Sequence, residues 1–207
     1  PVVSSAASDV YKRQAQREGE IPDFLWIITS PGQEEEILAN INKYFGSHVN
    51  ICGGSCADNE IAGNWKMFNG QDVFSQGCIV VGFFAQDEKI LSSFQSGYYP
   101  TSKSAVVTAA NGRELFALNG ESAAKVYNEW MDGRFSDLDL SENPSITTET
   151  TYFPFGREKG KVHDIPYYLL SHPESLTAEG GIRLFTDVHV GDKLILMESS
   201  QYDLQRR

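Results

Sequence analysis

Hydrophobic residues near the start of the chain follow the order strand, helix, strand. Residues 23–29 are apolar with almost no alternation, which is typical of a parallel strand covered on both faces. Ser30 then fits the N-cap of a helix, with Gln33 completing a capping box, and Gly46 fits the end of that helix. Residues 49–52 form a second buried strand, so the pattern predicts a β-α-β unit whose two strands are parallel. The apolar stripe of the predicted helix consists of Ile37, Leu38, Ile41, Tyr44 and Phe45.

The second of these strands is predicted to stop at Gly53-Gly54, a pair that favours a tight turn with exposed N–H groups. Ser55, Cys56 and Asp58 follow directly. In an open α/β sheet, ligands usually bind beyond the carboxyl ends of the strands. We therefore expect a ligand site at this turn. The alternative is a purely structural turn, in which the serine and aspartate side chains bond to the backbone.

Two Asn-Gly pairs further along the chain predict β-hairpins, because this dipeptide suits a type I′ turn. The pairs are Asn69-Gly70 and Asn111-Gly112. The predicted hairpin strands are residues 66–68 with 71–74 and residues 105–110 with 113–118.

Residues 78–84 between these hairpins form the most apolar run of the chain and are predicted to be a central strand. A further strand is expected over residues 89–95. From Asn119 the pattern becomes helical, and Gly133 fits the end of this helix.

The remainder of the chain is predicted to be rich in β-strands. Residues 135–150 have few apolar side chains and are interpreted as a connector. Strands are expected at residues 167–170, 182–188 and 193–197. The predicted fold class is therefore mixed α/β (α+β), with a parallel or mixed sheet and packed helices followed by a more antiparallel, β-rich half.

Charge and composition exclude several classes of partner and site. The formal net charge of −11 argues against nucleic acids and anionic membranes, which need clustered Lys and Arg. No apolar run approaches the roughly 18 residues of a membrane span, and no signal peptide is visible. Cys52, Cys56 and Cys78 lack disulfide or zinc spacing, so a reducing cytoplasm is the expected location. We expect no metal site and no cofactor.

Several motifs in order along the chain together resemble the FIST sensory domain family. The first is the turn from Gly53 to Asp58, where Cys56 replaces the small residue expected in the family. The order of the series is more specific than any one motif, and it covers most of residues 22–204. The other matching segments are Asn69-Gly70, residues 78–84, residues 96–101, Val107-Thr108, Asn111-Gly112, residues 118–120, residues 124–127, residues 153–156, residues 181–185 and residues 190–193.

This resemblance implies two packed halves, a partial N-terminal half over residues 15–118 and a partial C-terminal half over residues 119–207. Residues 1–14 resemble translated sequencing-adapter readthrough and are expected to be a non-native tail. The resemblance also implies truncation at both ends.

The resemblance further implies an intracellular sensing module, not an enzyme, that binds a small molecule such as an amino acid or related metabolite. A signalling effector domain is expected outside this fragment. The N–H groups of Gly54 and Ser55 are expected to receive a carboxylate, and Asp58 an ammonium group. Tyr98 and Thr101 are expected nearby. The expected ligand-binding residues are Gly53, Gly54, Ser55, Cys56, Asp58, Tyr98 and Thr101.

Two other functions remain open from the sequence. One group of FIST-like proteins binds haem and senses nitric oxide, and a single axial histidine would suffice. The candidate histidines are His48, His163, His172 and His189. The other function is a hydrolase with Ser55 as nucleophile, because residues 53–57 partly match the G-x-S-x-G elbow. Its base would be His163, His172 or His189, and its acid Asp164 or Asp187.

Overall fold

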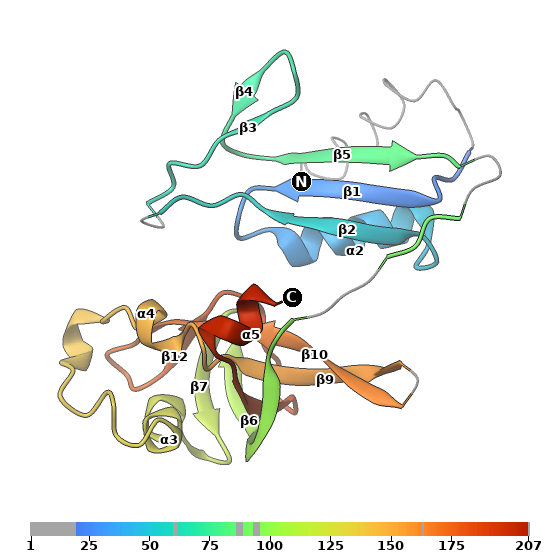
Figure 1. Ribbon diagram of the computed structural model, residues 1–207. Coiled ribbons are helices and arrows are strands. Elements are labelled where there is room, and N and C mark those ends of the chain that lie inside the picture. Colours follow the sequence, from blue (N-terminus) through green and yellow to red (C-terminus); the bar gives the residue numbers. More distant parts are fainter. Residues whose placement is uncertain (1–19, 60–61, 86–88, 93–95, 163, 207) are drawn as a thin grey trace. The chain divides into compact units, whose positions relative to one another are not determined.

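The computed structural model describes residues 20–206, apart from residues 60–61, 86–88, 93–95 and 163. The predicted tail, residues 1–14, lies outside the described residues. The chain forms two compact units, which adjoin in the sequence at residues 94 and 95 (Figure 1). Residues 118 and 119, where the two family halves were predicted to meet, both lie in the second unit.

The first unit contains the predicted β-α-β unit. Strand β1 (Phe24–Thr29) is followed by helix α2 (Glu34–Phe45) and strand β2 (Asn50–Ser55). The two strands pair in parallel, with Phe24 opposite Asn50 and Thr29 opposite Ser55. This confirms the parallel arrangement that the strand-helix-strand order predicted.

Helix α2 packs on one face of this sheet. Its buried residues Ile37, Ile41 and Phe45 form one core cluster with Leu25 and Ile27 of β1. Tyr44, which the apolar stripe included, is 54% exposed. On the opposite face Trp26, Val81 and Phe83 are also 43–46% exposed. The described residues of the first unit therefore cover β1 mainly from the helix side.

The predicted cap of α2 was wrong. The helix begins three residues later than expected, at Glu34, and Gln33 makes no capping hydrogen bond through its side chain. The Ser30 hydroxyl is used elsewhere: it donates to Gly77 O (3.2 Å) and accepts from Gly77 N–H (3.1 Å). Ser30 therefore joins the end of β1 to Gly77, the residue just before the strand over Cys78–Phe83.

The strand β5 (Cys78–Phe83) was predicted to be central and lies at an edge of the described sheet. The strand order of this sheet is β2-β1-β5, and β5 runs antiparallel to β1. None of the residues of β5 is buried in the described sheet, so its apolar sequence did not fix its place there. Residues 89–92 do not form the expected strand, and the rest of that prediction lies outside the described residues.

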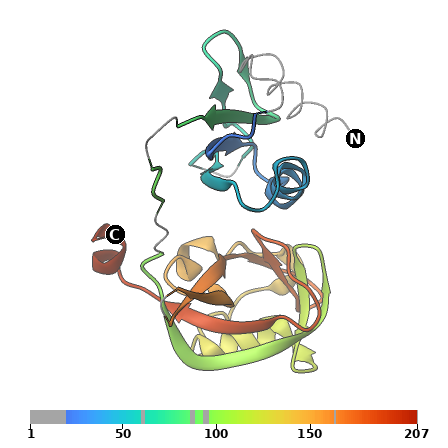
Figure 2. The same ribbon diagram turned by 90° about the vertical axis from the view of Figure 1, so that its right-hand side faces the viewer.

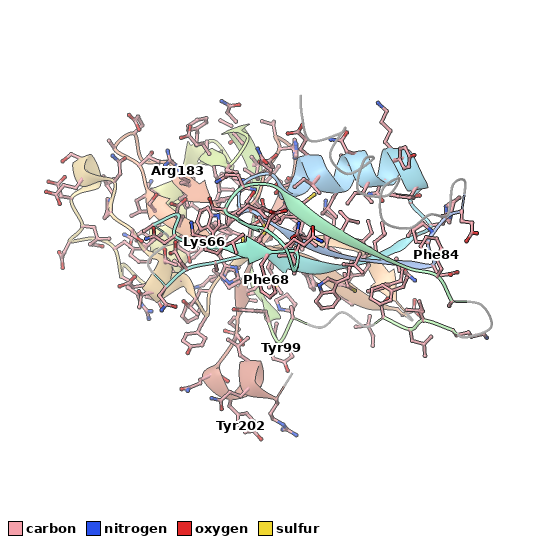
Figure 3. All side chains as sticks on the ribbon, turned by 90° about the horizontal axis from the view of Figure 1, so that it is seen from above. Lys66, Phe68, Phe84, Tyr99, Arg183 and Tyr202 are labelled. Carbon is pink, nitrogen blue, oxygen red and sulfur yellow. The ribbon has the colours of Figure 1, made fainter. Side chains whose placement is uncertain are left out.

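The first predicted hairpin is confirmed as β3 (Met67–Phe68) paired with β4 (Val73–Phe74). Its loop is longer than a two-residue turn, because Phe68 pairs with Val73 and residues 69–72 lie between them. Within this loop, Asn69 Oδ1 accepts hydrogen bonds from the N–H groups of Gln71 and Asp72. Phe68, labelled in Figure 3, is 75% exposed on this hairpin.

The second unit is built on an eight-stranded sheet in which all neighbouring strands are antiparallel. The order is β10-β9-β13-β6-β7-β12-β11, and β8 pairs with β7. The two units together confirm the mixed α+β class. The strands are β6 (Tyr99–Asn111), β7 (Glu114–Leu118), β8 (Glu121–Ser122), β9 (Phe155–Val162), β10 (Ile165–Ser171), β11 (Pro173–Leu176), β12 (Ile182–Leu184) and β13 (Lys193–Glu198).

Strand β6 organises the second unit, because it curves along its 13 residues and pairs with both β13 and β7 (Figure 2). The β6–β7 pair confirms the second predicted hairpin. Helix α3 (Ala123–Trp130) confirms the predicted helix and buries Ala123, Ala124 and Tyr127 in the core.

Several elements of the second unit were not predicted, among them the short strands β8 and β11. Strand β9 has the sequence FGREKGKV, whose charges and glycines hide the alternation of a strand. The predicted connector contains two short helices. The short elements are η1 (Leu140–Glu142), α4 (Thr147–Thr150) and α5 (Gln201–Gln205). No helix within the described ranges is long and apolar enough to cross a membrane.

Candidate functional site

The Gly53-Gly54 pair does not form the predicted turn, because β2 continues through both glycines to Ser55. Gly53 lies opposite Ile27 and Gly54 opposite Ile28. Gly53 has φ +149°, and a Cβ added to it would lie 1.8 Å from Ile27 O. Glycine is needed at position 53 because the two backbones approach closely, not because the chain reverses. The carboxyl edge of the strand pair is therefore at Thr29 and Ser55.

A polar cluster lies at this edge, and we call Thr29, Glu34, Ser55 and Cys56 the edge cluster. The Ser55 hydroxyl donates to Glu34 Oε1 at 2.5 Å, and this bond joins the end of β2 to the first residue of α2. The Oγ1 atom of Thr29 lies 3.4 Å from Ser55 Oγ. The other Glu34 oxygen accepts from Gly32 N–H at 2.8 Å. The cluster is thus bonded to both strands, the loop and the helix.

Glu34 is the member of the cluster that sequence reasoning missed. It is one of three consecutive acidic residues, Glu34, Glu35 and Glu36, and no sequence motif singled it out. Its position gave a usable indication, because the crossover helix of a β-α-β unit begins beside the carboxyl ends of the strands. A carboxylate in the first helical turn is also stabilised by the helix dipole.

Cys56 is bound to the backbone of β1. Its N–H and its Sγ both donate to Thr29 O, at 2.9 and 3.1 Å. Because Cys56 N–H faces β1, the alternation of a parallel strand pair turns the Gly54 N–H toward β1 as well. The Ser55 N–H then points to the opposite side of β2. Of the two N–H groups predicted to receive a carboxylate, only that of Ser55 points away from β1.

Asp58 shapes the loop that follows β2. Its two carboxylate oxygens accept hydrogen bonds from Ala62 N–H (2.9 Å) and Asn64 N–H (2.6 Å). This is the arrangement that the structural alternative described. Asp58 therefore holds the backbone of Ala62 and Asn64 through its two carboxylate oxygens.

Tyr98 and Thr101, the other two predicted ligand residues, belong to the second unit. The Tyr98 hydroxyl donates to Thr151 O (2.8 Å) and lies 3.3 Å from His172 Nε2. Burial, together with the neighbouring Tyr152, raises the pKa of Tyr98. The Thr101 hydroxyl accepts from Lys103 N–H at 3.2 Å. Both side chains thus have partners inside the second unit.

The hydrolase candidates Ser55, Asp187 and His189 have their hydrogen-bond and ion-pair partners within their own units. The hydroxyl of Ser55 bonds to Glu34 and Thr29 in the first unit. In the second unit, Asp187 pairs with Arg113 at 3.7 Å, and His189 Nδ1 lies 3.9 Å from Asp192.

The histidines, considered as metal or haem ligands, are dispersed. Burial lowers the pKa of His172, while the Thr151 carbonyl acts in the opposite direction. His48 is exposed, just after α2, and His163 lies outside the described residues. In the part of the chain that the structure describes, no group of three His, Cys, Asp or Glu residues could hold a metal ion.

Among protein families, the model of the FIST N domain matches residues 2–121. The matched range includes residues 2–14, which were predicted to be a non-native tail, and extends through β6 and β7. No curated protein and no protein of known structure matches the chain.

Proposed function

The chain belongs to the FIST N domain family, and we propose that it binds a small ligand carrying an amine, such as an amino acid or a related metabolite, at the edge cluster. FIST domains are non-catalytic sensory domains of signal-transduction proteins. The observation that carries the proposal is the hydrogen bond between Ser55 and Glu34 at the carboxyl edge of β1 and β2.

The location follows from the strand arrangement. Parallel strands place their carboxyl ends at the same edge, and loops from that edge bind ligands in open α/β sheets. Thr29 and Ser55 are opposite each other at this edge, and both carry hydroxyl groups. Such groups can orient a ligand through directed hydrogen bonds.

The preference for an amine follows from charge. Glu34 supplies a carboxylate at the cluster, and Glu35 and Glu36 follow it in the first turn of α2. A carboxylate can accept several hydrogen bonds at once, so its bond with Ser55 is compatible with a further charged donor. The ligand's own carboxylate, where present, would be received by the Ser55 N–H.

In this proposal, ligand binding at the edge cluster is passed to a signalling effector. The coupling would use the loops that follow β1 and β2, because both adjoin the ligand-contacting groups.

A thermal-shift screen with chemically matched ligands tests the proposal. Free amino acids are compared with their N-acetyl derivatives, which lack the charged amine, and with the corresponding amines, which lack the carboxylate. We expect stabilisation by at least one free amino acid or amine and none by its N-acetyl form.

Equal stabilisation by a free amino acid and its N-acetyl derivative would show that the amine is not recognised. Stabilisation that is unchanged in Ser55→Ala and Glu34→Gln would place the ligand elsewhere in the protein.

A further inference from the structure

The chain contains three Asn-Gly pairs, and the structure places them in different surroundings. The pairs are Asn69-Gly70, Asn111-Gly112 and Asn119-Gly120, and all six residues are exposed. Asparagine is chemically labile before glycine, because the glycine nitrogen can attack the carboxamide carbon and no side chain on the glycine hinders it. Since the three pairs share this sequence, their surroundings decide which of them reacts.

The carboxamide of Asn69 is held by two backbone donors. Its Oδ1 atom accepts hydrogen bonds from Gln71 N–H at 3.0 Å and from Asp72 N–H at 2.8 Å. These two bonds fold the side chain back over the Gly70 peptide. When a nitrogen attacks the carboxamide carbon, negative charge develops on Oδ1. Two N–H donors at about 2.7–3.1 Å are the arrangement that stabilises such an oxyanion.

The attacking nitrogen of this pair is free. Within the described residues, the Gly70 N–H donates no hydrogen bond, and a Cβ added to Gly70 would meet nothing within 4 Å. The hairpin that carries the pair, β3 with β4, is a separate two-stranded sheet with two residues in each strand (Figure 1). Short two-stranded sheets are only marginally stable, so the backbone rotation that the attack needs costs little here.

The other two pairs lack this combination. At Asn119, Oδ1 accepts from Val106 N–H at 2.9 Å, but the attacking nitrogen of Gly120 already donates to Thr108 Oγ1 at 2.9 Å. Asn111 is the last residue of β6, and no donor among the described residues is directed at its carboxamide. Both pairs adjoin strands of the eight-stranded sheet, whose hydrogen bonds resist backbone rotation.

We propose that Asn69 is a site of spontaneous deamidation, activated by the N–H groups of Gln71 and Asp72 and by the free nitrogen of Gly70. The Gly70 nitrogen loses its proton to solvent and bonds to Asn69 Cγ. The carboxamide nitrogen takes up a proton and leaves as ammonia, so a succinimide ring forms. Water then opens the ring: addition at Cγ gives aspartate, and addition at the backbone carbonyl gives isoaspartate.

The two products differ in their effect on the hairpin. Aspartate keeps an acceptor for the two N–H donors and adds a negative charge. Isoaspartate instead runs the backbone through Cβ and Cγ, which lengthens the loop between the paired residues Phe68 and Val73. The reaction lies outside the edge cluster, so it stands or falls separately from the proposed ligand site. In a sensory protein it would be a one-way change that records time and not ligand.

Peptide mapping by mass spectrometry on the full 207-residue chain tests the proposal. The chain is incubated at pH 8, folded in buffer and unfolded in guanidinium chloride, and deamidation is followed at all three pairs in each sample. Asn111 and Asn119 are therefore internal controls. We expect Asn69 to react faster in the folded chain than in the unfolded chain. In the folded chain it should also react at least about tenfold faster than either control.

Two variants at Gln71 test the role of the donors. Gln71→Pro removes the N–H group, and Gln71→Ala, the matched control, keeps it. We expect the folded-chain rate at Asn69 to fall in Gln71→Pro and to stay unchanged in Gln71→Ala. A folded-chain rate at Asn69 no higher than its rate in guanidinium chloride would overturn the proposal, because exposure alone would then explain the reaction. Faster reaction at Asn111 or Asn119, or an unchanged rate in Gln71→Pro, would overturn it as well.

Discussion

Two neighbouring glycines in β2 differ in what a side chain would meet. A Cβ on Gly53 would lie 1.8 Å from Ile27 O, whereas a Cβ on Gly54 would meet nothing within 4 Å. The sequence predicted that both glycines mattered for the same reason, a turn. The structure separates them, because only Gly53 faces the close approach of β1.

This difference gives a paired prediction. We expect Gly53→Ala to lower the free energy of unfolding by at least about 2 kcal/mol, through backbone strain and the clash with β1. Gly54→Ala should change the free energy of unfolding by less than about 1 kcal/mol. A gain in stability would come from the lower conformational entropy of the unfolded chain with alanine. Urea unfolding measures both. Equal losses in the two variants would contradict the register of β1 and β2.

Among single residues of the candidate site, Ser55 and Cys56 could be identified from the sequence because they follow an apolar strand. Glu34 was missed, because its role depends on where α2 begins, and the predicted cap at Ser30 placed that start three residues too early. Asp58 was identified, but its hydrogen bonds to Ala62 and Asn64 favour a role in the loop.

At the scale of elements, the sequence predicted best where the apolar pattern matched one period throughout. The stripe of α2 and the parallel order of β1 and β2 are examples. Strand β5 was misplaced because an apolar run does not show which strands will be its neighbours, and none of its residues is buried in the described sheet. Strand β9 was missed because Arg157, Glu158, Lys159 and Lys161 interrupt its alternation, and only the fold shows that Arg157 is buried against Asp192.

The ion pair between Arg157 on β9 and Asp192 before β13 fastens these elements together. The two side chains are 8% and 25% exposed, and Arg157 Nη1 lies 2.8 Å from Asp192 Oδ2. Asp192→Asn would leave the buried guanidinium without its counter-charge, so we expect a loss of about 3 kcal/mol at pH 7. Glu114→Gln, which removes the more exposed pair with Arg183, is the control and should cost less than about 1 kcal/mol.

This pair also predicts a pH dependence. Burial raises the pKa of Asp192, but the N–H of His189 and the Arg157 guanidinium outweigh it, so the folded-state pKa is below the ordinary value. The stabilisation is present above about pH 3.9 and is lost as pH falls through the folded-state pKa. The difference in unfolding free energy between wild type and Asp192→Asn should therefore shrink below pH 4. A constant difference would mean that the charge on Asp192 is unimportant.

At the scale of the whole molecule, the structure shows two compact units, each with its own core cluster. A division into two parts was expected from the resemblance to the FIST family, because length alone allows one large domain or two small ones. The junction near residues 94 and 95 could not be expected, because β6 and β7 resemble a continuation of the preceding hairpin pattern, and their partners β12 and β13 are distant in sequence.

Separate cores predict separate responses to core substitutions. Ile37→Ala removes a fully buried side chain from the first core, and Leu115→Ala does the same in the second. Each should destabilise its own unit by about 2–5 kcal/mol. Hydrogen exchange, resolved by peptide, should show faster opening in one unit only. Equal loss of protection in both units after either substitution would show that they unfold as one.

The central claim is that Glu34 at the edge cluster recognises the amine of a small ligand. Isothermal titration calorimetry with a free amino acid or amine from the screen tests it on wild type, Glu34→Gln and Glu36→Gln. Glu36 is the matched control, because it is exposed in the same helical turn and loses the same charge. We expect Glu34→Gln to weaken binding about tenfold to hundredfold, as for one charge-assisted hydrogen bond of about 1.5–3 kcal/mol, with Glu36→Gln unchanged. Equal affinity in all three proteins would contradict the claim.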